Sequence, residues 1–287
     1  MHAFDYVAAA SVDEALGVLA EHGDQAKVLA GGQSLIPLLN YRLAKPRVVV
    51  DINALPLDGL SVAMGRLRLG ALTRHAALEE SLELERYCPL LREAAALIGN
   101  VRVRTLGTLG GSLTHADPAA ELPMVMVALD AHLAIAGHAG RRTMTAREFF
   151  TGPLTTALAD DELLLGVEIP MTRDMGAAVE EVSRRAGDFA IVAATALVRV
   201  DRRGRVDDAR LAFGGVGPTP VRVAAAEELL VGSEPTSERI ARAADTARAT
   251  VAPESDAFVS AEYRRLLVGV LARRALTRAA ARALEVR

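Results

Sequence analysis

The stretch "VLAGGQSLIPLLNYRLAKP", residues 28–46, decides how the first part of this chain folds. An apolar run enters Gly31-Gly32, two polar residues follow, and a helix-like stretch with Pro37 in its first turn leaves. The pattern predicts a short helix between two strands, "AKVLAG" before it and "RVVVDI" after it. We expect the two strands to pair in parallel, as strands joined through a helix do.

The two glycines at this junction suit a phosphate group. Glycine lets backbone N–H groups turn outward and lets a ligand approach where a Cβ would block it. The helix that follows adds the positive end of its dipole. The segment has neither the third glycine of a Rossmann motif nor the Gly-Lys-Ser/Thr of a P-loop, and ordinary turn chemistry also explains a glycine pair.

A second stretch, "GTLGGSLTHADPAAELP" at residues 107–123, repeats this pattern and is predicted to be a loop. Small residues and hydroxyls gather within six positions, namely Gly107, Thr108, Gly110, Gly111 and Ser112. A single phosphate needs one such loop. Two of them therefore favour a dinucleotide whose pyrophosphate is held from two sides.

The segments on either side of these loops predict helices and strands in mixed order. "SVDEALGVLAEHG" predicts a helix that opens with a capping box between Ser11 and Glu14. One or two helices, broken at Pro89, are expected over residues 74–99. "LRLGAL" and "DELLLGVEIP" predict further strands.

The last third of the chain has a different pattern. "TALVRVDRRGRVDDARLAFGGV" predicts a β-hairpin with its turn at "DRRGR". Three helical stretches follow and close the chain. We place a domain boundary near residues 172–178, at "MTRDMGA".

The amino-acid composition limits the classes of protein to which this chain can belong. The chain has 287 residues, of which 51% are hydrophobic, so it can bury a sizeable core. One cysteine, Cys88, excludes a disulfide framework and an iron–sulfur cluster bound by this chain alone. The net charge of −3 gives no reason to expect nucleic acid, and the scattered histidines predict no metal site. The N-terminal pattern predicts no signal peptide and no membrane span, so a cytoplasmic location is expected.

The two glycine stretches resemble the FAD-binding medium subunit of the molybdenum hydroxylases. This family includes the medium subunits of carbon monoxide dehydrogenase, quinoline oxidoreductase and nicotine dehydrogenase, which match the flavin domain of xanthine dehydrogenase. The segments "VRVRTLGTLGGS", "DELLLGVEIP" and "SRRAGDFAIVAA" extend the resemblance over the whole chain.

The resemblance implies an α+β fold. It implies a two-subdomain FAD-binding domain of the vanillyl-alcohol-oxidase or PCMH type over residues 1–175, with subdomains of about 1–56 and 57–175. A C-terminal domain over residues 176–287, like that of the carbon monoxide dehydrogenase flavoprotein, should contain a small antiparallel sheet and a helical bundle.

The resemblance also implies the residues that bind FAD. The first glycine stretch should line the pyrophosphate with the backbone amides of Ala30, Gly31, Gly32, Gln33 and Ser34. Beside them should lie Leu29, Leu35 and Ile36. The second stretch should close over the pyrophosphate with Thr108, Leu109, Gly110, Gly111 and Ser112. Glu121 should contact the flavin polyol, Leu164 should pack against the cofactor, and Phe189 should lie near the isoalloxazine. A carboxylate at a helix start such as Glu121 is also stabilised by the helix dipole without any ligand.

Three positions depart from the family pattern. Ser112 stands in place of the commoner Asn, which shortens the reach of that polar group. Thr105-Leu106 stands in place of Asn-Arg, so a contact that organises the backbone could be lost. Glu180 stands where the xanthine dehydrogenase branch has a lysine, so that residue's role is not carried over.

The implied function is that of an electron-transfer subunit with no catalytic side chains of its own. FAD would be bound in this chain. A molybdopterin dinucleotide and two 2Fe–2S clusters would lie in a large molybdenum subunit and a small iron–sulfur subunit, assembled as a dimer of heterotrimers. Electrons from the clusters would pass through FAD to an external acceptor. A freestanding FAD-dependent oxidoreductase and a non-catalytic scaffold are the alternatives, and both the substrate and the acceptor stay open.

Overall fold

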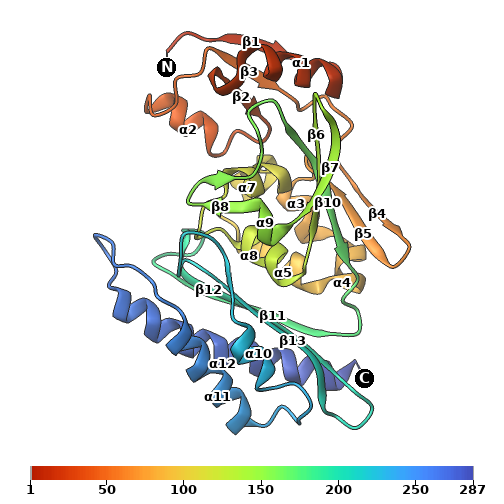
Figure 1. Cartoon of the computed structure of the whole chain (residues 1–287), viewed down its shortest axis with the longest axis vertical. Helices are drawn as coiled ribbons and strands as arrows, with labels where there is room; N and C mark the ends of the chain where they lie inside the picture. Colours follow the sequence, from red (N-terminus) through yellow and green to blue (C-terminus); the bar gives the residue numbers. More distant parts are fainter. Residues whose placement is uncertain (1, 287) are drawn as a thin grey trace.

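The computed structural model describes residues 2–286. Helices and strands mix throughout the chain, which confirms the α and β composition expected from the sequence. Three β-sheets follow one another along the longest axis, with the N-terminus at one end and the C-terminal helices at the other (Figure 1).

The first sheet contains three parallel strands in the order β1-β3-β2. Its elements are β1 (Asp5–Ala8), α1 (Val12–His22), a 3-10 turn (Gly23–Gln25), β2 (Ala26–Leu29), α2 (Leu35–Asn40) and β3 (Val48–Asp51). The predicted parallel pairing of the strands around α2 is confirmed, and β1 adds a strand that the sequence pattern did not predict.

The predicted capping box of α1 forms with a shifted partner. The Ser11 side chain accepts a hydrogen bond from the Glu14 N–H at 3.1 Å, as expected. The Glu14 carboxylate reaches back to the N–H of Ala10, at 2.7 Å, rather than to that of Ser11. Two N–H groups at the helix start are thus still satisfied.

The second sheet contains five antiparallel strands in the order β4-β5-β10-β6-β7. These strands are β4 (Leu60–Ala63), β5 (Arg66–Gly70), β10 (Leu163–Pro170), β6 (His132–Gly137) and β7 (Gly140–Thr145). The associated helices are α3 (His75–Glu80), α4 (Leu82–Tyr87), α5 (Pro89–Leu97), α6 (Val101–Leu106), α7 (Leu109–His115), α8 (Glu121–Ala128) and α9 (Ala146–Phe149). A small hairpin, β8 (Phe150–Gly152) and β9 (Thr155–Thr156), follows α9.

Two predictions for this part of the chain were wrong in detail. Residues 74–99 form three helices rather than one or two, because Ser81 also ends α3 and caps α4 by accepting the Leu84 N–H at 3.1 Å. Residues 107–123 are not all loop, because α7 occupies their middle. Thr108 starts that helix by accepting the Gly111 N–H at 3.1 Å.

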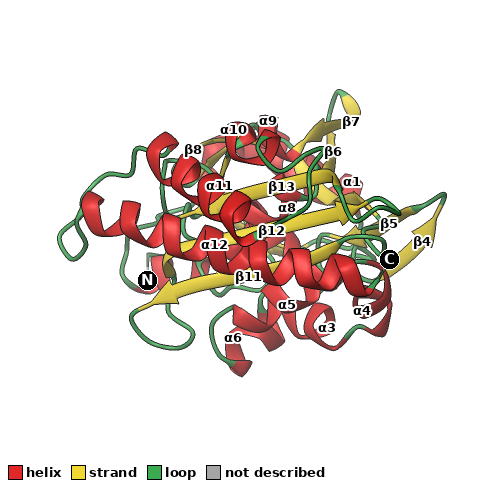
Figure 2. Cartoon of the chain, turned by 90° about the horizontal axis from the view of Figure 1, so that it is seen from below, coloured by secondary structure: helices red, strands yellow, loops and turns green. Residues whose placement is uncertain are grey.

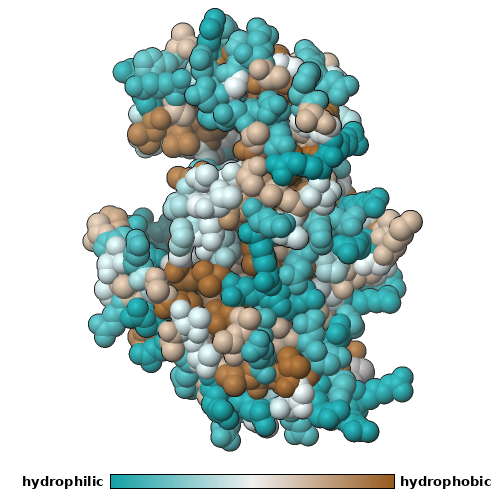
Figure 3. All heavy atoms as spheres, viewed as in Figure 1, coloured by the Kyte–Doolittle hydropathy of each residue, from teal (hydrophilic) through white to brown (hydrophobic). Residues whose placement is uncertain are grey.

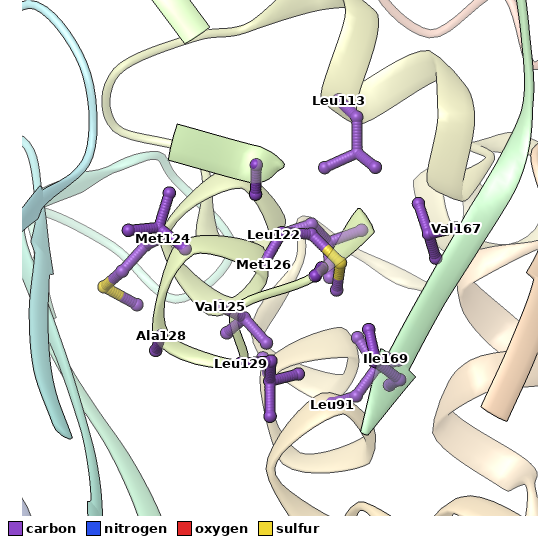
Figure 4. Packing of buried hydrophobic residues seen from close by; sticks show 14 of the residues in the cluster. Leu91, Leu113, Leu122, Met124, Val125, Met126, Ala128, Leu129, Val167 and Ile169 are labelled. Carbon is purple, nitrogen blue, oxygen red and sulfur yellow. The ribbon is translucent and has the colours of Figure 1, made fainter. Parts of the chain in front are cut away.

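Helix α8 is the centre of the main core. All eight of its residues are buried, and it packs against α5 on one side and against β12 and β13 on the other. Figure 4 shows its side chains pointing in several directions, with Leu91, Leu113 and Ile169 around them. A helix that is apolar all round is expected where it is covered on every side.

The third sheet contains four antiparallel strands, in agreement with the predicted C-terminal sheet. Its strands are β11 (Gly176–Ser183), β12 (Ala190–Val200), β13 (Val206–Gly214) and β14 (Val221–Arg222), followed by α10 (Ala224–Glu228), α11 (Ser237–Thr250) and α12 (Ala261–Glu285). The predicted hairpin is the β12–β13 pair. Figure 2 shows α11 and α12 lying over these strands. Among the described residues, no helix is both long and apolar enough to cross a membrane.

Ion pairs connect the third sheet and its helix α12 to the part of the chain that precedes them. Asp130, which follows α8, accepts hydrogen bonds from Arg222 at 2.9 Å and lies 3.3 Å from Arg210. On α12, Arg282 pairs with Glu93 of α5 at 2.6 Å. Because these pairs are partly exposed, we expect them to orient the sheet more than to stabilise it.

Gly176 lets α12 lie directly on β11. A Cβ at this position would stand 2.0 Å from the carbonyl oxygen of Ala279 and 2.2 Å from the backbone nitrogen of Ala283. Both atoms belong to the backbone of α12, so no side chain can move aside to make room. The close approach of helix and strand therefore requires glycine at residue 176.

We predict that Gly176→Ala destabilises the chain by about 1–3 kcal/mol, because the added methyl forces α12 away from β11. Gly17→Ala is the matched control. Gly17 lies in α1 with nothing within 4 Å of a Cβ, so alanine should be neutral or stabilise the chain by up to about 1 kcal/mol. Urea unfolding of both variants measures the difference, and equal stabilities would contradict the packing argument.

Candidate functional site

The first glycine turn lies between β2 and α2. Leu29 ends the strand, and Gly32 has a backbone φ of +71°, which side chains other than glycine rarely adopt. The turn then passes through Gln33 and Ser34 into α2, which starts at Leu35 and has Pro37 in its first turn as predicted. The apolar side chains of Leu29 and Ile36 pack over Gly32 from either side of the turn.

The backbone N–H groups of residues 31–34 in this turn have no hydrogen-bond acceptor among the described residues. The Gln33 side chain folds back to donate to the Gly31 carbonyl at 3.0 Å, which leaves the N–H edge clear. A row of free N–H groups at the start of a helix is the arrangement that binds phosphate oxygens.

In the second glycine stretch the N–H groups of residues 109–112 are occupied. The N–H of Leu109 donates to the Thr73 carbonyl at 2.9 Å, and that of Gly110 donates to the Ala71 carbonyl at 2.7 Å. The Ser112 N–H donates to the Thr108 carbonyl at 3.0 Å. These bonds, with the cap on Gly111, fix α7 against the strand end at residues 71–73. The stretch can thus offer a ligand its surface and hydroxyls more readily than a row of free N–H groups.

Packing against Ala71 requires glycine at residue 110, whereas Gly111 lies on a more open side of α7. A Cβ at Gly110 would stand 2.6 Å from the Cβ of Ala71. A Cβ at Gly111 would meet the Thr108 hydroxyl alone within 4 Å, so that side of the helix is otherwise open. The Ser112 hydroxyl, one position on, makes no hydrogen bond to the rest of the described chain.

The two glycine stretches meet at one point. A Cβ on Gly31 would lie 2.3 Å from the carbonyl oxygen of Leu106 and 2.8 Å from the Cα of Gly107. The backbones are therefore in van der Waals contact, as a clamp on one ligand would require. Figure 3 shows a notch between the N-terminal part and the rest of the molecule, beneath α2 (compare Figure 1).

His75, which the sequence analysis missed, supports the second stretch from beneath. Its ring is 5% exposed, and Nε2 lies 2.9 Å from the Thr108 carbonyl oxygen, so Nε2 carries the proton and donates it. Nδ1 is buried without a partner. Burial lowers the pKa of His75 to about 4, helped by the charges of Arg104 and Arg74, so the ring is neutral near pH 7.

Glu121, the first residue of α8, is 3% exposed and forms no ion pair within residues 2–286. Burial raises the pKa of Glu121 to about 7, and the carboxylates of Glu181 and Asp117 raise it as well, against a hydrogen bond from its own N–H. Glu181 pairs in register with Ala193, whose side chain belongs to the core around α8, so Glu181 faces the same side. Burial also raises the pKa of Glu181 to about 6.

The remaining two residues predicted to contact the cofactor, Leu164 and Phe189, differ in their exposure to solvent. Leu164 is 2% exposed in β10, within the core that also contains Leu109. Phe189 is 57% exposed in the turn between β11 and β12. In the same turn Arg184 stacks over the ring of Phe258, with 4.8 Å between its guanidinium carbon and the ring centroid.

Glu180 and Thr105, two of the departures from the family pattern, are engaged elsewhere. The Glu180 carboxylate forms an ion pair with Arg278 of α12. The Thr105 hydroxyl donates to the Val101 carbonyl of its own helix at 2.8 Å. Neither side chain is therefore free to replace a family contact at the glycine turns.

A cavity of about 690 Å³ lies away from the glycine turns, on the open face of the second sheet. Arg66, Arg68 and Glu168 line it, and Glu168 holds both arginines, at 3.3 Å and 2.8 Å. The Glu168 carboxylate thus offsets much of the positive charge of the two arginines. Among residues 2–286, no group of three His, Cys, Asp or Glu side chains could hold a metal ion.

Open N–H groups at residues 31–34 thus lie where two parts of a mixed α and β fold meet. Residues 2–172 match the family model described as the FAD binding domain in molybdopterin dehydrogenase. Residues 177–279 match the CO dehydrogenase flavoprotein C-terminal domain. The chain belongs to this family of FAD-binding subunits of molybdenum-dependent oxidoreductases, and the resemblance noted in the sequence is confirmed.

Relatives agree over the full length. The chain is 42% identical to the 6-hydroxypseudooxynicotine dehydrogenase complex subunit alpha of Paenarthrobacter nicotinovorans, covering 98% of this chain and 95% of that protein. It is 39% identical to the caffeine dehydrogenase subunit beta of Pseudomonas sp. (strain CBB1), covering 98% and 96%. The solved carbon monoxide dehydrogenase of Hydrogenophaga pseudoflava that lacks the Mo-pyranopterin moiety of its cofactor superimposes with a TM-score of 0.95 at 37% identity, covering 98% of both chains.

We predict that Glu121→Gln removes part of the pH dependence of stability. The folded chain prefers protonated Glu121, so its stabilising effect is present below about pH 4.5 and is lost as pH rises towards 7. The glutamine variant, which is neutral at every pH, should be more stable than the parent at pH 8 by about 1–3 kcal/mol. Urea unfolding of the flavin-free chain at pH 5 and pH 8 measures this.

Glu228→Gln, at an exposed position of α10, is the control for that comparison. Its unfolding free energy should follow that of the parent at both pH values. A Glu121→Gln profile that parallels the parent from pH 5 to pH 8 would show that Glu121 stays ionised in the folded chain.

Proposed function

We propose that this chain is the FAD-carrying electron-transfer subunit of a heterotrimeric molybdenum hydroxylase. In this role it takes electrons from 2Fe–2S clusters in a partner subunit and passes them to an external acceptor. The observation that carries the proposal is the row of free N–H groups at residues 31–34, held against the second glycine stretch in a chain that matches this family over nearly its whole length.

The residues present fit FAD. The open N–H groups of the first turn and the start of α2 suit the pyrophosphate, while Gly111 and Ser112 offer an open surface opposite them. FAD supplies the redox chemistry when bound, and the protein supplies binding and orientation. The first subdomain and the second would form the PCMH-type arrangement expected from the sequence, with the division from the C-terminal domain near residue 175.

Glu121, Leu164 and Phe189 complete the proposed cofactor contacts. A buried carboxyl without a protein partner is suited to a ligand hydroxyl, which is the role proposed for Glu121 towards the flavin polyol. Phe189 is exposed and can turn onto a flat ring. Leu164 is buried in β10, and its proposed role is to pack against the cofactor as part of the core beside the site.

We propose a small iron–sulfur subunit and a large molybdenum subunit as partners, in a dimer of heterotrimers in the cytoplasm. Support comes from the names of the relatives, which are subunits of dehydrogenase complexes. The chain's single cysteine, Cys88, is fully buried, so a cluster must come from another chain. The molybdenum subunit would then choose the substrate.

Gly111→Val should weaken FAD binding about 100-fold, a loss of about 2.7 kcal/mol. The side chain would project from α7 where the pyrophosphate is proposed to pass, and, among the described residues, the one atom within 4 Å of its Cβ would be the Thr108 hydroxyl oxygen, at 2.8 Å, which would have to shift. Titration of the flavin-free chain with FAD, followed by flavin fluorescence, measures the affinity. Gly17→Val in α1 is the control, and unchanged FAD affinity in Gly111→Val would remove the pyrophosphate from this position.

The function is tested on the native complex. We expect a visible spectrum with flavin bands over an iron–sulfur background, three kinds of subunit, and molybdenum in the same sample. Flavin bands in a single-chain preparation without iron or molybdenum would instead establish a freestanding FAD-dependent oxidoreductase. Absence of flavin from both preparations would overturn the proposed function.

A further inference from the structure

One guanidinium connects the two glycine stretches. Arg74, which precedes α3, donates through Nη1 to the carbonyl of Leu106. Its Nη2 donates to Oδ1 of Asn53 at 2.7 Å. The Asn53 amide nitrogen then donates to the carbonyl of Ala30, in the first glycine turn, at 2.9 Å. Arg74 and Asn53 thus form a continuous bridge, from residue 30 to residue 106, which we call the Arg74–Asn53 bridge.

Asn53 is oriented for this bridge by its neighbours. Asp51 Oδ1 accepts both the Asn53 N–H at 2.8 Å and the Asn53 side-chain amide at 2.7 Å. The other Asp51 oxygen accepts the Tyr6 hydroxyl at 2.6 Å. Because the amide nitrogen of Asn53 faces Asp51 and Ala30, its oxygen must face Arg74. The asparagine therefore has one orientation that satisfies all of these groups.

The bridge ends at the point where the glycine stretches touch. The Leu106 carbonyl that accepts from Arg74 is the same atom that excludes a Cβ from Gly31. Its position therefore sets the spacing between the open N–H groups of the first turn and the surface of α7. The Thr105 hydroxyl bonds within α6, and the Leu106 side chain is 52% exposed.

We infer that Arg74 and Asn53 are positioning residues for the cofactor, holding the two glycine stretches at the spacing that a dinucleotide pyrophosphate needs. The inference rests on the proposed FAD-binding function and adds to it two residues that touch the loops rather than the cofactor.

A double-mutant cycle on FAD binding tests the bridge. Asn53→Ala and Arg74→Ala should each weaken FAD binding about 10-fold in the full chain. The double variant should also lose about 10-fold, because either substitution already breaks the same bridge. Arg74→Lys should resemble Arg74→Ala, since one ammonium cannot span the two acceptors in the planar arrangement of a guanidinium.

Arg68→Ala is the matched control, because Arg68 pairs with Glu168 on the open face of the second sheet. Its FAD affinity should equal that of the parent. The unfolding midpoint of each flavin-free variant is measured alongside, because a purely structural bridge would show its coupling there and leave FAD affinity unchanged. Should Arg74→Ala fail to fold, Asn53→Ala and Arg74→Lys still decide the question.

A double variant that loses about 100-fold would overturn the inference, since the two residues would then act independently. Single variants that bind FAD like the parent would overturn it as well. A parent chain that binds no FAD would instead refute the proposed function, so the two failures are distinguishable.

Discussion

The contact between Gly31 and the Leu106 carbonyl is the constraint on which the candidate site depends. At this point the backbones of the two glycine stretches approach more closely than any Cβ would allow. The first stretch can then present free N–H groups towards a surface that is already fixed by α7 and His75. The candidate site thus has one edge that offers free N–H donors and a second edge whose N–H groups at residues 109–112 are already bonded.

Burial in the middle of the molecule sets the environment of Glu121. Helix α8 is covered by α5 and by the third sheet, so Glu121 at its start has lost most of its water. A carboxyl in such a place favours the neutral form or a ligand that donates to it. The third sheet therefore does more than complete the fold, since β11 also brings Glu181 to the same side.

Local patterns were read correctly from the sequence where neighbouring residues decide the structure. Pro37 and the glycines before it place the β2–α2 turn, and Ser11 caps α1, because each of these effects acts within one helical turn. The prediction of a loop at residues 107–123 failed for a different reason. Glycines and hydroxyls there were interpreted as a phosphate-binding loop, whereas Gly110 is needed so that α7 can pack on Ala71, a residue distant in sequence.

The sequence by itself determined the class of protein, because the two glycine stretches and their flanking segments are family motifs that can be recognised in the sequence alone. It also determined that this chain alone cannot ligate an iron–sulfur cluster, because it has a single cysteine. Tertiary structure alone decided which N–H groups remain free, that Glu121 is buried, and that Arg74 and Asn53 join the two stretches. These properties depend on which segments become neighbours, and hydrogen bonding and loss of water are settled by neighbours in space rather than along the chain.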